Sequence, residues 1–328
     1  MIARIGVIGG GAWGTALAQV AAGKGHDTLL WAREPEVVAG INDTRQNPLF
    51  LPGIPLSDRI KATGELARLD GCNAWLVVTP AQHMRAVLEQ APRCDRPLIL
   101  CSKGIEERSG HLLHHVAREV CPGASVMVLS GPTFAHEVAT GLPTALTLAA
   151  DGDNLAEQVR DRLALPQFRL YLSDDLAGAE VGGAVKNVLA IACGVVEGKG
   201  LGQNARAALI ARGFAEMTRF GLACGARRET LAGLSGLGDL VLTCSSTSSR
   251  NFSLGKGIGE GRSAAELMAD RRTVAEGAFT APVLRRIADE RGIDMPIVAA
   301  VDDLLAARAN VDQVLEALLS RPPRPEAH

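Results

Sequence analysis

Short apolar runs alternate with helical segments through the first half of the chain. The apolar runs cover residues 3–8, 27–31, 75–79, 98–101, 126–129 and 144–149, and the first is rich in β-branched residues. Residues 14–22 and 82–90 lie between such runs and have helical periodicity. Because strands that alternate with helices form a parallel sheet covered on both faces, we predict an α/β domain with a Rossmann-type doubly wound sheet.

The pattern changes near residue 173, after which strand-like runs are scarce. Helical periodicity then dominates, over residues 176–197, 205–224, 263–269, 281–290 and 297–307. We therefore predict a dinucleotide-binding domain over residues 1–172 and a mostly α-helical substrate and catalytic domain over residues 173–328. The proline-rich tail at residues 321–325 is predicted to be disordered.

A glycine-rich motif of the form GxGxxG follows the first predicted strand and opens the first helix, at residues 9–14 (GGGAWG). Gly9 would permit a tight turn, Gly11 would let the backbone approach a pyrophosphate, and Gly14 would allow close helix packing. The helix N-terminus favours the negative charge of the phosphates. The motif predicts a dinucleotide site; a glycine-rich turn without a ligand is the alternative.

The end of the second strand bears on the choice of cofactor. Sites for NAD usually place an acidic residue there, about 20 positions after the glycines, to bind the ribose 2′-hydroxyl. This chain has Arg33, whose guanidinium matches a 2′-phosphate, followed directly by Glu34. We expect NADP or NAD, with NADPH used at least as well as NADH. A solvated charge at a strand end is the alternative for Arg33.

Lys186 lies in an apolar helical segment, residues 181–191 (VGGAVKNVLAI). If it is buried, desolvation lowers its pKa, which suits proton transfer near neutral pH. A lysine that extends to the surface is the alternative. Asn187 beside it would orient or cap other groups and does not titrate.

Polar groups also follow several predicted strands. Lys103, residues 79–80 (TP) and residues 130–133 (SGPT) all lie where a strand ends, and ligands of doubly wound sheets bind there. Ordinary turn chemistry is the alternative. Further on, a hydroxyl-rich loop ends in Arg250 and Asn251, which can bind a phosphate; its alternative is a mobile serine-rich loop.

Composition limits the classes of partner. The net charge is −2, from 34 basic and 36 acidic residues, and this balance offers no attraction to nucleic acid or an anionic membrane. The apolar runs, such as residues 189–196, are short for a membrane span, and no signal peptide is expected.

The seven cysteines are widely spaced, so we expect reduced thiols and a cytoplasmic location. His111 and His115 lack a metal motif and predict a solvated helix face.

Seven short motifs, taken together and in order, closely resemble the bacterial NAD(P)-dependent glycerol-3-phosphate dehydrogenase family over nearly the whole chain. They are residues 9–18 (GGGAWGTALA), 101–106 (CSKGIE), 130–137 (SGPTFAHE), 183–191 (GAVKNVLAI), 236–243 (GLGDLVLT), 249–252 (SRNF) and 273–277 (TVAEG). The resemblance implies reduction of dihydroxyacetone phosphate to sn-glycerol 3-phosphate, for glycerophospholipid synthesis.

The resemblance also implies a role for each matching residue. Lys186 would be the catalytic acid and base, Asp239 would hold Lys186 and a substrate hydroxyl, and Lys103 would contact both substrate and cofactor. The remaining substrate contacts would be Gly131, Thr133, Ser249, Arg250 and Asn251. The dinucleotide would contact Gly9, Gly11, Ala12, Trp13, Gly14, Arg33, Ala135, Arg250, Val274 and Glu276. His136 departs from the family, which often has lysine there.

Two alternatives stay open beside this assignment. One is a dehydrogenase of the same plan that acts on another small hydroxyacid or sugar acid, against which the phosphate-binding set at residues 249–251 argues. The other is a non-catalytic dinucleotide sensor, against which Lys186 and Asp239 argue. No metal is expected. The sequence leaves the oligomeric state open, with a homodimer as the candidate assembly.

Overall fold

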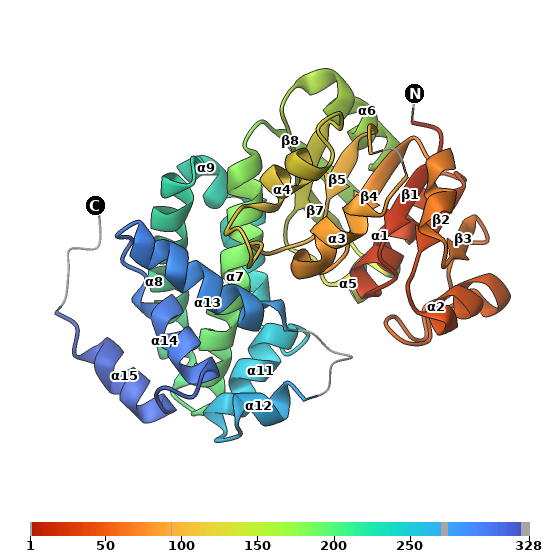
Figure 1. Cartoon of the computed structure of the whole chain (residues 1–328). Helices are drawn as coiled ribbons and strands as arrows, with labels where there is room; N and C mark the ends of the chain where they lie inside the picture. The colour runs from red at the N-terminus through yellow and green to blue at the C-terminus, as the bar shows by residue number, and fades with distance from the viewer. Residues whose placement is uncertain (1, 93, 270–274, 323–328) are drawn as a thin grey trace. The chain divides into compact units, whose positions relative to one another are not determined.

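The computed structural model describes residues 2–92, 94–269 and 275–322 (Figure 1). The described residues form one eight-stranded sheet in the order β3-β2-β1-β4-β5-β6-β7-β8. Its strands are β1 (Ile5–Ile8), β2 (Thr28–Trp31), β3 (Ile60–Thr63), β4 (Ala74–Val77), β5 (Leu98–Leu100), β6 (Val126–Ser130), β7 (Thr144–Ala150) and β8 (Phe168–Ser173). The first six have the strand order of a Rossmann fold, as predicted.

The sheet is not parallel throughout, which corrects the prediction. β7 pairs with β6 in the antiparallel sense, with Val128 opposite Ala149, and β8 then pairs in parallel with β7. The link from β6 to β7 holds only the short helix α5 (Ala135–Ala139). Because antiparallel neighbours need no crossover connection, the chain can turn back directly beside β6.

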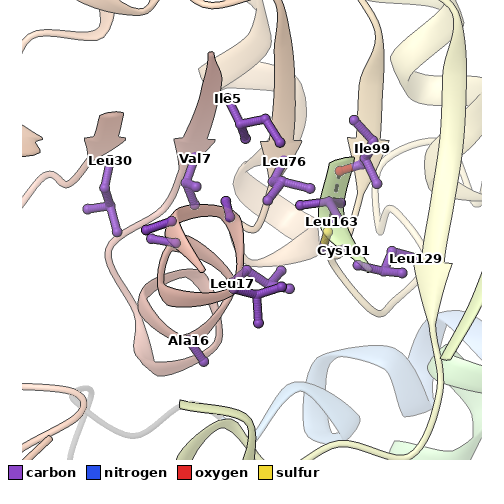
Figure 2. Close-up of a cluster of buried hydrophobic side chains, with 14 of the residues drawn as sticks. Ile5, Val7, Ala16, Leu17, Leu30, Leu76, Ile99, Cys101, Leu129 and Leu163 are labelled. Atoms are coloured by element: carbon purple, nitrogen blue, oxygen red, sulfur yellow. Dashed lines mark hydrogen bonds between the residues drawn. The ribbon is translucent and has the colours of Figure 1, made fainter. Parts of the chain in front are cut away.

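Side chains of the inner strands alternate between two apolar clusters. Val7, Leu76, Ile99 and Leu129 belong to one cluster, and their sequence neighbours such as Val77 and Leu100 belong to the other. Figure 2 shows the first cluster, in which Leu17 of helix α1 (Ala12–Ala22) lies on the side of the helix toward the strands. Burial of each large side chain stabilises the fold by about 1.5–3 kcal/mol, so both faces hold the strands in register.

Helices cover both faces of this sheet. Those on the side of the first cluster are α1, α5 and α6 (Asp153–Leu163), and those on the other side include α3 (Met84–Glu89) and α4 (Leu113–Val120). Helix α2 (Pro35–Ala39) follows β2. The later helices are α7 (Leu176–Gly198), α8 (Gly202–Ala223), α9 (Arg228–Leu231), α10 (Asp239–Thr243), α11 (Arg250–Gly259), α12 (Ala264–Leu267), α13 (Glu276–Glu290), α14 (Pro296–Leu305) and α15 (Val311–Leu319).

The chain divides into two compact units. The sheet unit comprises Met1–Gly183 with Gly221–Leu242, and the helical unit comprises Ala184–Phe220 with Thr243–His328. The boundaries between them fall inside α7, α8 and α10. The domain boundary at residues 172–173 stays a prediction, and residues 323–325 of the predicted disordered tail lie outside the described residues.

Helix α7 is apolar enough and long enough to cross a bilayer. The sequence did not suggest this, because its uninterrupted apolar runs, such as residues 189–196, are short. It has 23 residues, with a mean hydropathy of 1.5 over its most apolar window, and all of that window is buried inside the protein. The core helix of a folded protein has the same composition, so this helix is weak support for a membrane span.

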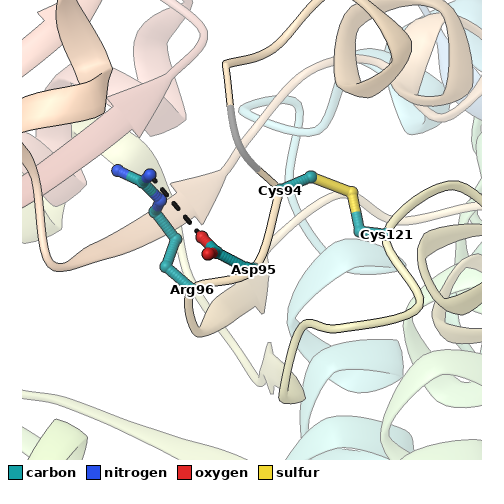
Figure 3. Close-up of a disulfide and its surroundings, with 4 residues drawn as sticks. All are labelled: Cys94, Asp95, Arg96 and Cys121. Carbon is teal, nitrogen blue, oxygen red and sulfur yellow. Dashed lines mark ion pairs between the residues drawn. A yellow bond between two sulfur atoms is a disulfide. The ribbon is translucent and has the colours of Figure 1, made fainter.

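A disulfide joins Cys94 and Cys121, which corrects the expectation of seven reduced cysteines (Figure 3). The two residues are 27 positions apart, and the fold brings their Cα atoms to 5.1 Å because one precedes β5 and the other follows α4. That separation is within the range a disulfide spans. The remaining cysteines, at 72, 101, 193, 224 and 244, keep their thiols.

Helices α7 and α11 of the helical unit pack backbone against backbone. A Cβ placed on Gly194 of α7 would lie 2.0 Å from the Phe252 carbonyl oxygen, and one on Gly255 of α11 would lie 1.9 Å from the Ile191 oxygen. One turn further along, Gly198 and Gly259 repeat the contact. Only glycine allows this separation, so four glycines determine how closely the two helices approach.

We expect Gly255→Ala to destabilise the protein because the added methyl group meets main-chain atoms. Overpacking costs about 1–3 kcal/mol, and the better helix propensity of alanine offsets up to about 1 kcal/mol of that. The free energy of unfolding in urea and the Tm measure the loss. Gly213→Ala is the control: its new Cβ would lie 2.9 Å from a Leu189 methyl group, which can move. Equal stability of Gly255→Ala and wild type would contradict the backbone contact.

Candidate active site

The glycine-rich loop between β1 and α1 has a geometry that side chains would prevent. Gly9 has a φ of +127°, and a Cβ there would lie 2.9 Å from the Val78 carbonyl oxygen at the end of β4. A Cβ on Gly14 would lie 1.9 Å from the Gly9 oxygen. At Gly11 an added Cβ meets no atom within 4 Å, so the backbone there borders open space. The loop can therefore admit a ligand directly against its main chain.

The start of α1 suits the pyrophosphate of a dinucleotide. Its N-cap residue, Gly11, has no side-chain cap, so the first amides of the helix are available to an anion. The indole Nε1 of Trp13 is buried and has no hydrogen-bond partner within the described part of the chain. Ala12, Trp13 and Ala135 of α5 all pack against the first apolar cluster. These residues fit a dinucleotide whose polar groups would satisfy the orphaned donors.

Arg33 and Glu34 follow β2 and pair with each other. The Arg33 Nη2 atom lies 3.1 Å from the Glu34 Oε1 atom, and the two side chains are 79% and 27% exposed. An exposed pair of this kind contributes at most about 1 kcal/mol, so it leaves the guanidinium able to move to another anion. Ala32 beneath it is buried, and a Cβ on Gly10 would lie 2.4 Å from the Ala32 Cβ.

Lys103, Gly131 and Asp239 meet at the carboxyl ends of β5 and β6. The Lys103 Nζ donates to the Gly131 carbonyl oxygen at 3.1 Å and to the Asp239 Oδ2 at 2.6 Å. The Asp239 side chain is fully buried at the start of α10, and that of Lys103 is 16% exposed. Thr133 lies nearby, with its hydroxyl 3.4 Å from the same Gly131 oxygen. The structure thus joins two distant motifs by a charge-assisted hydrogen bond.

Two hydroxyls come from the strand-end turns that the sequence marked, residues 79–80 and 130–133. Ser130 ends β6 and Thr79 follows β4; both are buried, and neither hydroxyl has a partner among the described residues. The Ser130 Oγ and the Lys103 Cγ each lie 3.2 Å from the position of a Cβ on Gly183. Buried hydroxyls without partners are costly, and a bound ligand would satisfy them.

Lys186 of the helical unit is buried, with 6% of its surface exposed, so the alternative of a lysine that extends to the surface is wrong. Its Nζ donates to the hydroxyl of Thr243 at 2.8 Å. Thr243 ends α10 and is 3% exposed. No sequence pattern pointed to Thr243 as this partner, because the two residues are far apart along the chain.

Residues 249–251 form the start of α11, a helix that the periodicity did not predict. The Ser249 hydroxyl caps this helix by accepting from the Phe252 amide at 3.3 Å, and Arg250 is exposed in its first turn. The Asn251 Nδ2 donates to the Asn187 Oδ1 at 3.0 Å, and its Oδ1 accepts from the Gly277 amide at 2.9 Å. A guanidinium at a helix N-terminus favours an anion.

Three further predicted positions lie around these groups. Glu276 begins α13 in the helical unit and is half-buried. His136, where the family often has lysine, is exposed on α5. Val274 lies outside the described residues.

His111 and His115 are both exposed and their ring centroids lie 6.0 Å apart, although His111 precedes α4. His111 is exposed and lies 2.9 Å from Glu119, whereas His114 is buried with its Nδ1 2.6 Å from the Glu180 Oε2. Burial raises the pKa of Glu180, and the hydrogen bond with His114 opposes that shift. Across the described ranges, no group of three or more His, Cys, Asp or Glu side chains could hold a metal ion.

Comparison with known proteins places both halves of the chain in one family. Residues 4–156 match the model of the NAD-dependent glycerol-3-phosphate dehydrogenase N-terminus, and residues 175–316 match that of its C-terminus. A relative named glycerol-3-phosphate dehydrogenase (NAD(P)+), from Erythrobacter litoralis, is 64% identical over 99% of this chain and 98% of its own.

Solved structures agree with this match. The glycerol-3-phosphate dehydrogenase of Coxiella burnetii is 37% identical, with a TM-score of 0.93 over 98% of this chain and 99% of its own. A D-mandelate dehydrogenase in complex with NADH has a TM-score of 0.62 over 93% of this chain and 98% of its own; at 12% identity it shows a shared fold alone. On the family models and the full-length relatives, the chain belongs to the NAD-dependent glycerol-3-phosphate dehydrogenase family.

Proposed function

We propose that the chain is an NAD(P)-dependent oxidoreductase that reduces dihydroxyacetone phosphate to sn-glycerol 3-phosphate. The observation that carries this proposal is Lys186, a lysine buried in the apolar helix α7 and hydrogen-bonded to Thr243. Membership of the family supports the choice of substrate, because relatives with this activity in their names are similar over the full length. Lys186 would act as the catalytic acid and base.

Reduction of a ketone builds negative charge on the carbonyl oxygen. The bound nicotinamide supplies the hydride. The Lys186 ammonium would stabilise the developing charge and donate the proton to that oxygen, since a positioned donor in a dry site is most effective where charge appears. Thr243 accepts from Nζ and so limits its rotation. In the reverse reaction the neutral amine would take the proton from the substrate hydroxyl.

Lys103 and Asp239 would act as a coupled pair. The buried Asp239 carboxylate accepts from Lys103 at 2.6 Å, which keeps both side chains in fixed positions. In this proposal Asp239 would also accept from a substrate hydroxyl, and Lys103 would contact both substrate and cofactor. Gly131 and Thr133 would line the substrate, with Gly131 held through its carbonyl oxygen.

Arg250 would bind the substrate phosphate, with Ser249 and Asn251 beside it at the start of α11. The helix N-terminus and the guanidinium both favour an anion. Asn251 is already held on two sides, by Asn187 and Gly277, so its position needs no further ordering. Binding energy from the remote phosphate would orient the reacting carbon.

For the cofactor, Gly9, Gly11 and Gly14 with the start of α1 would hold the pyrophosphate. Contacts from Ala12, Trp13, Ala135, Lys103, Arg250, Val274 and Glu276 complete this part of the proposal. Arg33 would bind a 2′-phosphate after leaving Glu34, so we propose that NADPH is used at least as well as NADH. NADH lacks the phosphate and meets no clash, so both cofactors would be accepted.

We further propose that the protein works in the cytoplasm, with a homodimer as the candidate assembly, and supplies glycerophospholipid synthesis without nucleic acid or membrane insertion. The near-neutral net charge of −2 and the burial of the most apolar part of α7 support the last point. The Cys94–Cys121 disulfide is unusual for a reducing compartment, although five other cysteines keep their thiols.

An absorbance assay tests the proposed function. The purified chain should oxidise NADPH and NADH only when dihydroxyacetone phosphate is added, with kcat/KM for NADPH at least equal to that for NADH. Turnover with small 2-keto acids in its place would favour the hydroxyacid alternative, and binding of cofactor without turnover would favour a dinucleotide sensor. A preference for NADH of about tenfold or more, or ~1.4 kcal/mol, would show that Arg33 does not bind the phosphate.

Lys186→Ala should remove most of kcat while cofactor binding stays nearly intact. General acid catalysis contributes about 10²- to 10⁴-fold, and the lost charge stabilisation adds to this. Steady-state rates give the loss, and quenching of protein fluorescence gives the cofactor Kd. Lys61→Ala is the control, because Lys61 is an exposed lysine on β3. A variant within about tenfold of wild type would remove Lys186 from the catalytic role.

Arg250→Ala should impair recognition of the substrate phosphate. A hydrogen bond to a charged group contributes about 1.5–3 kcal/mol, so kcat/KM for dihydroxyacetone phosphate should fall by about one to two orders of magnitude. The loss should be much smaller with dihydroxyacetone, which has no phosphate. Arg262→Ala, which removes an exposed arginine paired with Glu266, serves as the control. An equal loss on both substrates would place Arg250 elsewhere.

A further inference from the structure

A buried asparagine outside the glycine motif, Asn47, donates hydrogen bonds to two residues of the loop and of helix α1. Asn47 lies beyond β2 and α2 and is fully buried, with 0% of its surface exposed. Its Nδ2 donates to the Gly10 carbonyl oxygen at 2.8 Å and to the Thr15 hydroxyl at 2.8 Å. Its Oδ1 accepts from the Phe50 amide at 3.1 Å. Both ends of the amide group therefore have the partners that they need.

Thr15 extends this connection along the loop. Its Oγ1 accepts from Asn47 and donates to the Gly11 carbonyl oxygen at 2.9 Å. Asn47 determines which group donates and which accepts in this series of hydrogen bonds. If its amide were rotated by 180°, its oxygen would face the Gly10 oxygen and its NH₂ group would face the Phe50 amide. Two successive carbonyl groups of the glycine loop thus accept from side chains, and the Gly11 oxygen also accepts from the Thr15 amide at 2.9 Å.

These carbonyl contacts also orient the amides that would meet the cofactor. In a trans peptide the C=O and the following N–H point in opposite directions within one plane. When the Gly10 oxygen is held by Asn47, the Gly11 N–H points to the other side, and the Gly11 oxygen orients the Ala12 N–H in the same way. These N–H groups lie at the uncapped start of α1, where a phosphate binds.

We propose that Asn47 and Thr15 are positioning residues for the dinucleotide, which keep the Gly11 and Ala12 amides directed at its pyrophosphate. The proposal rests on the proposed cofactor and adds residues that would touch no part of it. Without Asn47 or the Thr15 hydroxyl, the Gly10–Gly11 peptide plane could rotate, because both side chains contact the Gly10 carbonyl oxygen, at 2.8 and 3.4 Å. Binding of the pyrophosphate would then require that this plane be ordered again.

The test measures dinucleotide binding in the absence of substrate. Asn47→Ala and Thr15→Val should each raise the Kd for NADPH, NADH and ADP-ribose by about tenfold, since ADP-ribose carries the same pyrophosphate. Thr15→Ser keeps the hydroxyl and should bind within about threefold of wild type. In steady-state assays the KM for the cofactor should rise while kcat changes much less.

Asn42→Ala is the matched control. The Asn42 amide bridges the backbone of Ala62, at 3.0 and 2.9 Å, in the same part of the fold but away from the glycine loop. It should lower the Tm and leave the Kd unchanged. Folded Asn47→Ala or Thr15→Val with a Kd within twofold of wild type, or an equal rise in Asn42→Ala, would overturn the proposal. If Asn47→Ala does not fold, Thr15→Val alone decides. A wild type that binds no dinucleotide would overturn the cofactor assignment as well.

Discussion

Close approach of one backbone segment to another is the constraint on which both compact units depend. In the sheet unit a Cβ on Gly14 would lie only 1.9 Å from the Gly9 carbonyl oxygen. The absence of that Cβ lets the start of α1 pack close to the end of β1. In the helical unit, α7 and α11 meet through Gly194, Gly198 and their partners on α11. Lys186 of α7 and Arg250 of α11 project from these closely packed helices, so the glycine contacts limit where the two side chains can lie.

The inner part of the sheet could be predicted because its strands are buried on both faces. Continuous apolar runs such as residues 98–101 are typical of strands that are buried on both faces of a sheet. They therefore predicted the central strands to within a few residues. The two edge strands were missed. β3 has an exposed Lys61, and β8 alternates buried residues with exposed ones such as Arg169 and Tyr171, so neither forms an apolar run. The reversal of β7 was also beyond prediction, since strand direction depends on the connection.

The residue types at the candidate site could be predicted, but their partners could not. Short motifs pointed to Lys103, Lys186 and Asp239, and the resemblance named their roles. The contact of Lys103 with Asp239 spans 136 positions, and that of Lys186 with Thr243 spans 57, distances over which no local pattern acts. The disulfide between Cys94 and Cys121 was missed for the same reason, because spacing alone does not determine which cysteines meet.

The two helix N-termini that are proposed to bind phosphates share one design. At α1 the backbone is held by Asn47, and at α11 Asn251 is held by Asn187 and the Gly277 amide. An asparagine side chain offers a donor and an acceptor with no net charge, so it can satisfy buried main-chain groups without repelling or neutralising an anion nearby. A carboxylate in either place would oppose the phosphate. Neutral buried amides therefore leave charge recognition to the helix ends and to the exposed guanidinium groups.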